Sequence, residues 1–282
     1  MSGGEAAPSA PAPPVTEPPV TAPPPAEEGA SLLRRRLLHV SVEGNIGAGK
    51  STLLLEVERQ WDEGRAAAQA AAIPWELRTL CEPVADWMAP ALADGQSMLS
   101  AFYEAPSSLA FTFQMFVMLT RLNQLRAARM ACEQDDARAG HAHVLLTERC
   151  IASSGELFVR PAWEAGRMDE AQWHTYRVWE REARSQVEPR ALDGVVYLRT
   201  PPVFCVTRIS ARKRPGEAGR VQAAYVTALH AAHEAYVERL RAGGTPVLVL
   251  DADPRSDGTA DAVRSDAARV LGFLGALLSR GG

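Results

Sequence analysis

The sequence has no long apolar run, no paired cysteines and no excess of positive charge, and each absence excludes a class of protein. No segment of the 282 residues approaches the roughly 18 apolar residues that a membrane-spanning helix needs, so we expect no membrane partner. The four cysteines lie far apart and form no CxxC pair, which favours reduced thiols in the cytoplasm over a disulfide scaffold. A formal net charge of -4 argues against nucleic-acid binding, which needs a basic face.

The N-terminal segment also lacks what a folded domain needs. From Met1 to about Ala30 it is rich in Pro, Ala and Glu, with almost no large apolar side chains to offset the entropy of ordering. We therefore expect residues 1–36 to be a disordered tail before one folded domain at residues 37–282. Four glutamates precede the first arginine, whereas a mitochondrial transit peptide is Arg-rich and acid-poor, so mitochondrial import is the less favoured localisation.

Short apolar runs alternate with helical segments from Leu37 onward. The runs are rich in Val, Leu and Ile, as the strands of a buried parallel sheet are. The expected strands are Leu38–Val42, Glu76–Cys81, Val144–Thr147, Gly194–Leu198 and Pro246–Leu250. The helical segments between them include Ser51–Asp62, Leu109–Arg129, Glu170–Arg184 and Ala223–Arg241. This alternation predicts an α/β fold, a doubly wound five-stranded parallel sheet flanked by helices.

The stretch VSVEGNIGAGKSTLL, Val40–Leu54, contains the pattern GxxxxGK[ST] between an expected strand and an expected helix. Glycines let consecutive backbone N–H groups turn toward phosphate oxygens, and the helix adds its positive N-terminal end. Lys50 would reach the β- and γ-phosphates of ATP, and the Ser51 hydroxyl would bind Mg²⁺. The expected nucleotide-binding residues are Gly44, Asn45, Ile46, Gly47, Ala48, Gly49, Lys50, Ser51 and Thr52. A glycine-rich structural turn is the alternative interpretation.

Two later strands are followed by charged residues. Glu82 follows the second expected strand, and Glu148 and Arg149 follow the third. In an open α/β sheet, ligands bind outside the carboxyl ends of the strands, so both carboxylates are expected on the side of Lys50. Surface acids placed there by chance are the alternative.

A basic cluster lies in the segment RISARKRPGEAG, where Arg208 and Arg212 share one helix face. A solvated basic helix end is common and is one interpretation. Beside a phosphate loop, we favour a lid in which Arg208, Arg212 and Arg214 fold over the triphosphate and neutralise charge during transfer.

Six blocks now show a specific resemblance in order and spacing. They are SVEGNIGAGKST, EPVADW, FTFQMFVMLTRL, TERC, LDGVVYLRTPPVFCVTRISARKRPGE and LHAAHEAYVERL. Together they resemble the deoxyribonucleoside kinase family, which includes deoxycytidine, deoxyguanosine and mitochondrial thymidine kinases, the insect multisubstrate kinase and some viral thymidine kinases. The resemblance covers about Leu37 to Leu274. It implies a phosphate-loop kinase fold, ATP with Mg²⁺, and a homodimer formed through helices. A viral member would act in the host cytosol or nucleus.

The resemblance also implies roles for individual residues. Glu82 matches the general base that takes the proton from the nucleoside 5′-hydroxyl, a role a carboxylate can fill. Arg149 would hold the 5′-oxygen region, and Glu148 would organise Mg²⁺ with Ser51. The transfer itself is assigned to Glu82, Arg149, Lys50 and the lid residues Arg212 and Arg214.

The acceptor pocket follows in the same way. Gln114 matches the glutamine that recognises the base edge, and an amide in this apolar run needs a partner, although a polar helix face is the alternative. Tyr103 and Glu217 match the pair that binds the sugar 3′-hydroxyl. The aromatic walls of the base slot would be Trp87, Phe113 and Phe158.

One position departs from the family's pattern and affects the choice of substrate. Arg121 matches the arginine that deoxycytidine and deoxyguanosine kinases place beside the base, but Ser154 stands where their aspartate would be. Losing the acid makes room for a 5-methyl group, so we favour thymidine with deoxycytidine tolerated. A kinase for deoxycytidine or purine deoxynucleosides is the alternative. The segment SSGELF lacks the usual Arg-Tyr pair, which suggests a differently shaped helix, and Cys150 replaces the customary serine.

Other classes remain open at this point. A non-catalytic relative of the fold, a nucleotide-dependent switch and a nucleoside monophosphate kinase all carry the phosphate loop. The first would be expected to lose Lys50, Glu82 or the lid arginines, which are all present. Pairs of histidines at 141 and 143 and at 230 and 233 have no third metal ligand at a recognised spacing, so we interpret them as structural.

Overall fold

The computed structural model describes residues 37–67, 75–139, 142–212, 214, 217, 219–252 and 258–280. The tail predicted for residues 1–36 lies outside the described residues, and the division at residue 37 stays a prediction. Among the helices of the described ranges, none is long and apolar enough to cross a membrane.

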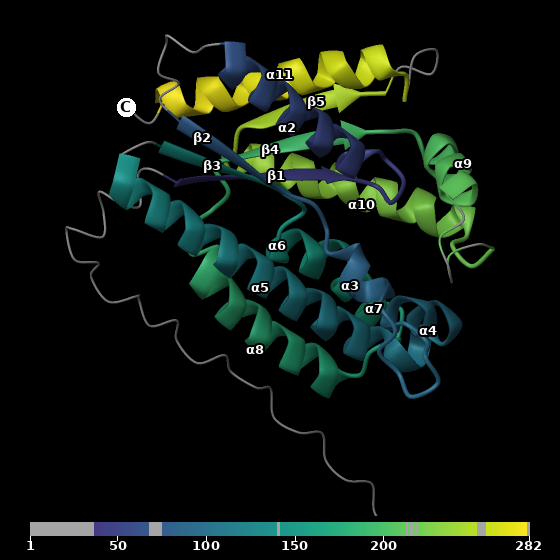
Figure 1. Cartoon of the computed structure of the whole chain (residues 1–282). Helices are drawn as coiled ribbons and strands as arrows, with labels where there is room; N and C mark the ends of the chain where they lie inside the picture. The colour runs from purple at the N-terminus through teal and green to yellow at the C-terminus, as the bar shows by residue number, and fades with distance from the viewer. Residues whose placement is uncertain are drawn as a thin grey trace, which may run out of the picture. The chain divides into compact units, whose positions relative to one another are not determined.

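Five parallel strands form one sheet in the order β2-β3-β1-β4-β5 (Figure 1). The strands are β1 (Leu37–Gly44), β2 (Trp75–Leu80), β3 (Ala142–Glu148), β4 (Gly194–Arg199) and β5 (Val247–Asp251). Each overlaps an expected strand and differs from it by at most a few residues at an end. The predicted α/β fold, a five-stranded parallel sheet flanked by helices, is therefore confirmed.

Helices cover both faces of the sheet. The long ones are α2 (Lys50–Ala67), α5 (Pro106–Ala139), α8 (Glu170–Val187), α10 (Ala223–Ala242) and α11 (Ala260–Arg280). The shorter ones are α3 (Val84–Met88), α4 (Met98–Glu104), α6 (Ile151–Ser154), α7 (Arg160–Glu164) and α9 (Pro202–Arg212), with one π-helical turn, η1 (Gly155–Val159). The four helical segments named from the sequence correspond to α2, α5, α8 and α10.

The strand β3 shows how the two faces are built. Successive side chains of a strand point to opposite faces of the sheet. Val144 and Leu146 accordingly pack in the cluster that contains α2 and α11, while Leu145 between them packs in the cluster that contains α5 and α8. Figure 1 shows these two helix pairs on opposite sides of the sheet. A strand buried on both faces explains the continuous apolar run that the sequence shows here.

The sheet brings the chemistry to one edge. Because all five strands are parallel, their carboxyl ends lie along the same edge. Gly44 ends β1, Glu148 ends β3, and Glu82 comes two residues after β2. Since β3 pairs with both β1 and β2, these three residues come from adjacent strands.

Leu54 and Leu55 on α2 provide a matched test of this packing. Leu54 is 0% exposed and Leu55 is 60% exposed. We expect Leu54→Ala to lower the free energy of unfolding by about 2–5 kcal/mol, because it removes buried methyl groups and leaves a cavity. Leu55→Ala is expected to change it by less than about 0.5 kcal/mol. Urea unfolding of both variants measures the difference, and equal effects would contradict the assignment of the buried face.

Candidate active site

The phosphate loop has the backbone that its glycines predict. Gly44, Gly47 and Gly49 all have positive φ angles, of 150°, 79° and 102°. A Cβ on Gly47 would lie 2.7 Å from the carbonyl oxygen of Cys205 in α9, so a side chain there would collide with backbone. The Asn45 side chain donates to the carbonyl of Val226 in α10 (2.8 Å) and ties the loop to that helix. The loop is therefore held at the N-terminus of α2 by its contacts with α9 and α10.

Lys50 lies inside this loop, almost fully buried. Its ammonium donates to the carbonyl oxygens of Gly44 (3.2 Å) and Asn45 (2.9 Å) and lies 3.7 Å from a Glu148 oxygen. Burial and the positive charge of Arg149 together lower the pKa of Lys50 to about 8, although the nearby carboxylates oppose the shift. A phosphate group entering the loop would give this lysine a stronger partner than the carbonyls.

Ser51 and Glu148 meet as the sequence led us to expect. The Ser51 hydroxyl donates to Glu148 Oε2 (2.8 Å), and the backbone N–H of Glu82 donates to the same oxygen (3.3 Å). This hydroxyl and carboxylate offer only oxygen ligands, which suit a hard cation such as Mg²⁺ that keeps several waters. Within the described ranges, no group of three or more His, Cys, Asp or Glu side chains is arranged to hold a metal ion.

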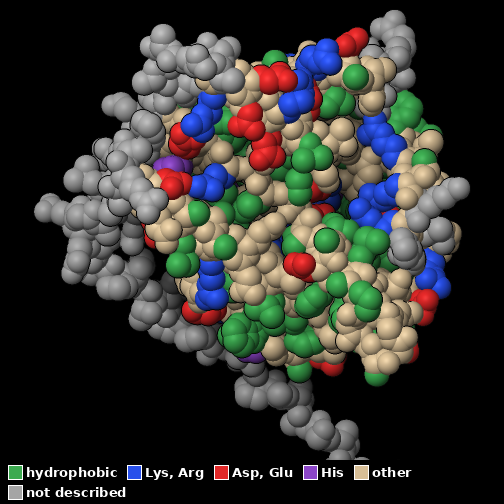
Figure 2. All heavy atoms as spheres, in the orientation of Figure 1, with side chains coloured by type: hydrophobic (Ala, Val, Ile, Leu, Met, Phe, Trp, Pro, Cys, Tyr) green, Lys and Arg blue, Asp and Glu red, His purple; other side chains and the backbone are tan. Residues whose placement is uncertain are grey.

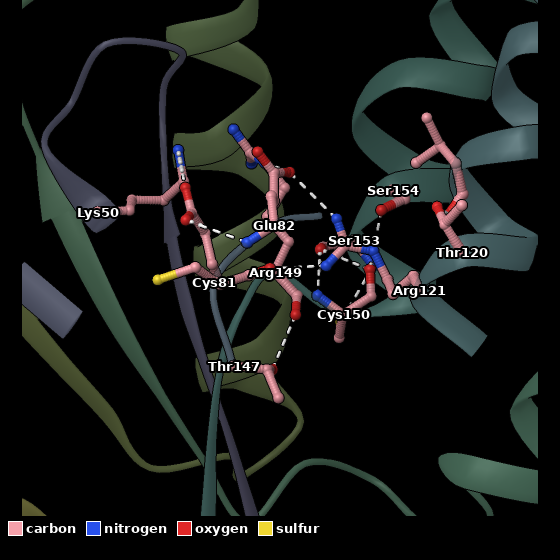
Figure 3. A network of polar contacts seen from close by, with 12 residues as sticks. Lys50, Cys81, Glu82, Thr120, Arg121, Thr147, Arg149, Cys150, Ser153 and Ser154 are labelled. Carbon is pink, nitrogen blue, oxygen red and sulfur yellow. Dashed lines mark hydrogen bonds and ion pairs between the residues drawn. The ribbon is translucent and has the colours of Figure 1, made fainter. Parts of the chain in front are cut away.

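Glu82 lies between two arginines. Arg121 Nη2 is 3.0 Å and Arg149 Nε is 3.2 Å from the same carboxylate oxygen, and Figure 3 shows the three side chains together. Burial by itself would raise the pKa of Glu82, but Arg149, Arg121 and Lys50 together bring it below its usual value. The carboxylate is thus ionised at neutral pH and able to accept a proton.

One cavity of about 690 Å³ joins these groups to an apolar slot. Lys50, Glu82 and Arg149 lie along it, and Figure 2 shows the face hollowed beside a group of basic side chains. The expected walls Trp87, Phe113 and Phe158 all line the cavity. The rings of Trp87 and Phe113 meet edge to face at 6.1 Å. Phe102, which the sequence did not single out, stacks on Phe113 at 4.6 Å.

Gln114 lies on the cavity wall with most of its surface buried. Within the part of the chain that the structure describes, its amide has no hydrogen-bond partner. An amide on the cavity wall without a protein partner suits a ligand that offers a donor and an acceptor side by side.

Arg121 and Ser154 both line this cavity, but each forms its hydrogen bonds with the protein. Arg121 donates to the backbone carbonyl of Glu148 (2.6 Å) as well as to Glu82, so it serves the carboxylate. Ser154 donates back to the carbonyl of Cys150 (2.9 Å) in its own helix. Cys150 is the N-cap of α6, in a reciprocal pair with Ser153, which explains how a cysteine replaces a serine there. The segment SSGELF continues α6 into the π-helical turn η1.

The expected sugar pair and the lid share one carboxylate. Tyr103 donates to Glu217 Oε1 (3.2 Å), which brings the predicted pair together. Arg212 binds both oxygens of Glu217 (2.7 and 2.5 Å), and Arg214 lies 3.5 Å from one of them. Arg208 is separate from this group and donates to the loop carbonyls of Gly47 and Ala48. Glu217 therefore links the acceptor pocket to the lid.

The comparisons with known proteins agree with this geometry. A family model described as deoxynucleoside kinase matches residues 40–267. The chain belongs to the deoxynucleoside kinase family. This confirms the resemblance seen in the six sequence blocks, and it makes the protein a phosphotransferase, so the switch and monophosphate kinase alternatives fall away.

Several curated relatives of this kinase cover most of its length. It is 31% identical to deoxycytidine kinase 2 of Gallus gallus over 252 residues, 80% of this chain and 86% of that protein. It is 31% identical to deoxycytidine kinase of Mus musculus over 215 residues, 72% of this chain and 76% of that protein. Mitochondrial deoxyguanosine kinase of Xenopus laevis is 25% identical over 256 residues, 84% of this chain and 90% of that protein.

The position of Glu82 predicts a shift in the pH dependence of this kinase. As the general base that the resemblance implies, Glu82 would have to be ionised to accept a proton, so we expect the rate to fall as the pH drops through its pKa. Arg121→Met removes one of the cations that lower this pKa, and we expect the acidic limb of kcat/KM to move up by about one pH unit. Activity profiles at constant ionic strength measure it, with Arg59→Met on the exposed face of α2 as the control. An unmoved limb in Arg121→Met would contradict the electrostatic role of Arg121.

Proposed function

We propose that this kinase transfers the γ-phosphoryl group of ATP to the 5′-hydroxyl of a deoxynucleoside in nucleotide salvage. The observation that carries the proposal is the Glu82 carboxylate, ionised between two arginines in a cavity that also reaches Lys50 and Gln114. A base, a phosphate loop and an apolar slot with one free amide then lie along a single cavity, as an in-line transfer needs.

The donor side of the proposed reaction uses the phosphate loop. Its backbone N–H groups and Lys50 would bind the β- and γ-phosphates, and Arg212 and Arg214 would neutralise charge on the transferred group. Ser51 and Glu148 have the oxygen ligands that Mg²⁺ prefers and would hold it with water. When bound, the metal neutralises phosphate charge.

The acceptor side uses other residues of the same cavity. Tyr103 and Glu217 would bind the sugar 3′-hydroxyl, and Trp87, Phe113 and Phe158 would enclose the base. Glu82 would take the 5′-hydroxyl proton as the oxygen attacks phosphorus, and Arg149 would hold that oxygen in place. The amide of Gln114 would pair with the base edge.

For the nucleobase of the preferred substrate, the relatives favour deoxycytidine over thymidine. Ser154 favoured thymidine, but the relatives named above are deoxycytidine and deoxyguanosine kinases. The Gln114 amide can pair with cytosine or thymine, so it does not discriminate between them. We therefore propose deoxycytidine as the preferred acceptor, with thymidine as the second candidate because Ser154 leaves room for a methyl group.

A homodimer is part of the same proposal. The neighbouring helices α5 and α8 expose Leu119 and Trp179, each more than half exposed, and a second copy would cover such apolar side chains. Measuring the mass of the protein in solution tests this dimer.

We also propose that the kinase acts in the cytoplasm.

Glu82→Gln tests the base. The amide keeps the size of the side chain but cannot take a proton, so we expect kcat to fall by about 10²–10⁴-fold while deoxynucleoside binding is largely retained. Steady-state kinetics with ATP and binding of the nucleoside alone separate the two. Glu63→Gln, on the exposed side of α2, is the control. An unimpaired kcat in Glu82→Gln would remove Glu82 as the base.

Ser154→Asp tests the choice of base. Restoring the acid beside Arg121 is expected to raise the ratio of deoxycytidine to thymidine kcat/KM by about tenfold, because the carboxylate fills the space for the methyl group. Assays with each of the four deoxynucleosides give the ratio for the wild type and the variant. Ser154→Ala is the control for loss of the hydroxyl alone, and an unchanged ratio in Ser154→Asp would show that this position does not select the base.

A further inference from the structure

Arg149 has a backbone conformation that its residue type rarely adopts. Its φ is 63°, and it is the single non-glycine residue with positive φ in the described part of the chain. Two hydrogen bonds hold it there: its N–H donates to the carbonyl of Val42 (3.1 Å), and its carbonyl accepts from the Thr147 hydroxyl (2.8 Å). Strain of this kind persists where the surrounding structure fixes a residue, and it is concentrated at functional sites.

The Arg149 guanidinium reaches three sides at once. Its Nε lies 3.2 Å from Glu82, and its Nη2 donates to the carbonyl of Gly44 in the phosphate loop (2.9 Å). The Arg149 side chain thus joins Glu82 to the phosphate loop. Its remaining nitrogen, Nη1, lies next to His233 of α10.

His233 of α10 is the hydrogen-bond partner of Arg149 Nη1. Its Nε2 lies 3.1 Å from Arg149 Nη1, and its Nδ1 lies 2.7 Å from the backbone carbonyl of Leu229. A carbonyl oxygen can only accept, so Nδ1 carries the hydrogen and Nε2 offers its lone pair to the guanidinium. The side chain is 0% exposed, and its burial and the charge of Arg149 hold its pKa well below the usual value. His233 is therefore neutral, with one tautomer assigned by its partners.

Two further contacts restrict this pair. The ring of Tyr197 in β4 lies parallel to that of His233, with centroids 6.3 Å apart. The buried carboxylate of Glu43 lies 3.5 Å from Arg149 Nη1 and accepts from the Ser41 hydroxyl (2.6 Å). Nη1 thus faces one neutral acceptor and one carboxylate, and neither His233 nor Glu43 lines the cavity.

We propose that His233 is a positioning residue for phosphoryl transfer, because its neutral Nε2 accepts from Arg149 and fixes the guanidinium between Glu82 and the phosphate loop. The inference rests on the proposed function of Arg149. It goes beyond the sequence interpretation, in which His233 was structural. The imidazole acts through Arg149, so its loss is expected to affect turnover more than binding.

Two substitutions separate this role from simple packing. In His233→Gln, the side-chain carbonyl can reach the position of Nε2 and accept from Arg149, although the bond to Leu229 is lost. In His233→Leu, the volume is similar but no acceptor remains. His230→Leu, one turn earlier on α10 and partly exposed, is the matched control because its ring lies near Glu234 and not near Arg149.

The expected result is a split between kcat and KM. For His233→Leu we expect kcat to fall about ten- to a hundredfold, as misplacement of a group near the reacting atoms costs, with each KM within about twofold of the wild type. His233→Gln should recover most of kcat, and His230→Leu should match the wild type. Full activity in folded His233→Leu, or equal losses in His233→Gln and His233→Leu, would overturn the proposal.

A second measurement applies even if His233→Leu does not fold. Nitrogen-15 NMR of the imidazole in the wild-type chain should show a neutral ring with hydrogen on Nδ1 at neutral pH. A hydrogen on Nε2, or a charged ring, would overturn the proposal without any reference to activity. Absence of activity in the wild type with all four deoxynucleosides would instead contradict the proposed function, and the two failures are therefore distinguishable.

Discussion

The contact on which the site depends is that of the Arg149 guanidinium with Glu82 on one side and the Gly44 carbonyl on the other. It joins two loops that follow different strands, through an Arg149 side chain that is only 2% exposed. Because Arg149 sits in a strained backbone conformation, its direction is set by β1 and β3 and not by its own preference. The phosphate loop and the Glu82 carboxylate are thereby held in a fixed relation.

The charges around this contact are balanced inside the protein. Cations and carboxylates pair at the carboxyl edge of the sheet. The buried ones are Lys50, Arg121, Arg149, Glu43 and Glu148, and Glu82 beside them is partly exposed. An isolated buried charge is costly, so each is stable only with its partners in place. The same balance keeps Glu82 ionised, since the nearby cations outweigh the effect of burial on its pKa. Structure and reactivity at this edge thus have one electrostatic origin.

The acceptor pocket follows a different principle, because its walls are aromatic and one amide supplies the polarity. Gln114 lies among the aromatic side chains of α3, α4 and α5, with no partner in the described residues. In the proposed function, apolar walls would accept any flat base, so discrimination would fall to the few polar positions near its edge. Position 154 is one of them, and it lies at the start of the π-helical turn that also carries Phe158 into the cavity.

The sequence by itself determined the fold class, the phosphate loop and the order of the charged strand ends. These depend on local patterns, namely apolar runs, glycine spacing and helix starts, which a linear chain displays directly. It placed Glu82 and Arg149 after two expected strands, and the family resemblance supplied their roles and that of Gln114. It did not reveal that Arg121 binds Glu82, that Phe102 stacks on Phe113, or that His233 accepts from Arg149. The last contact joins residues 84 positions apart, and only packing of α10 against the sheet brings them within 3.1 Å.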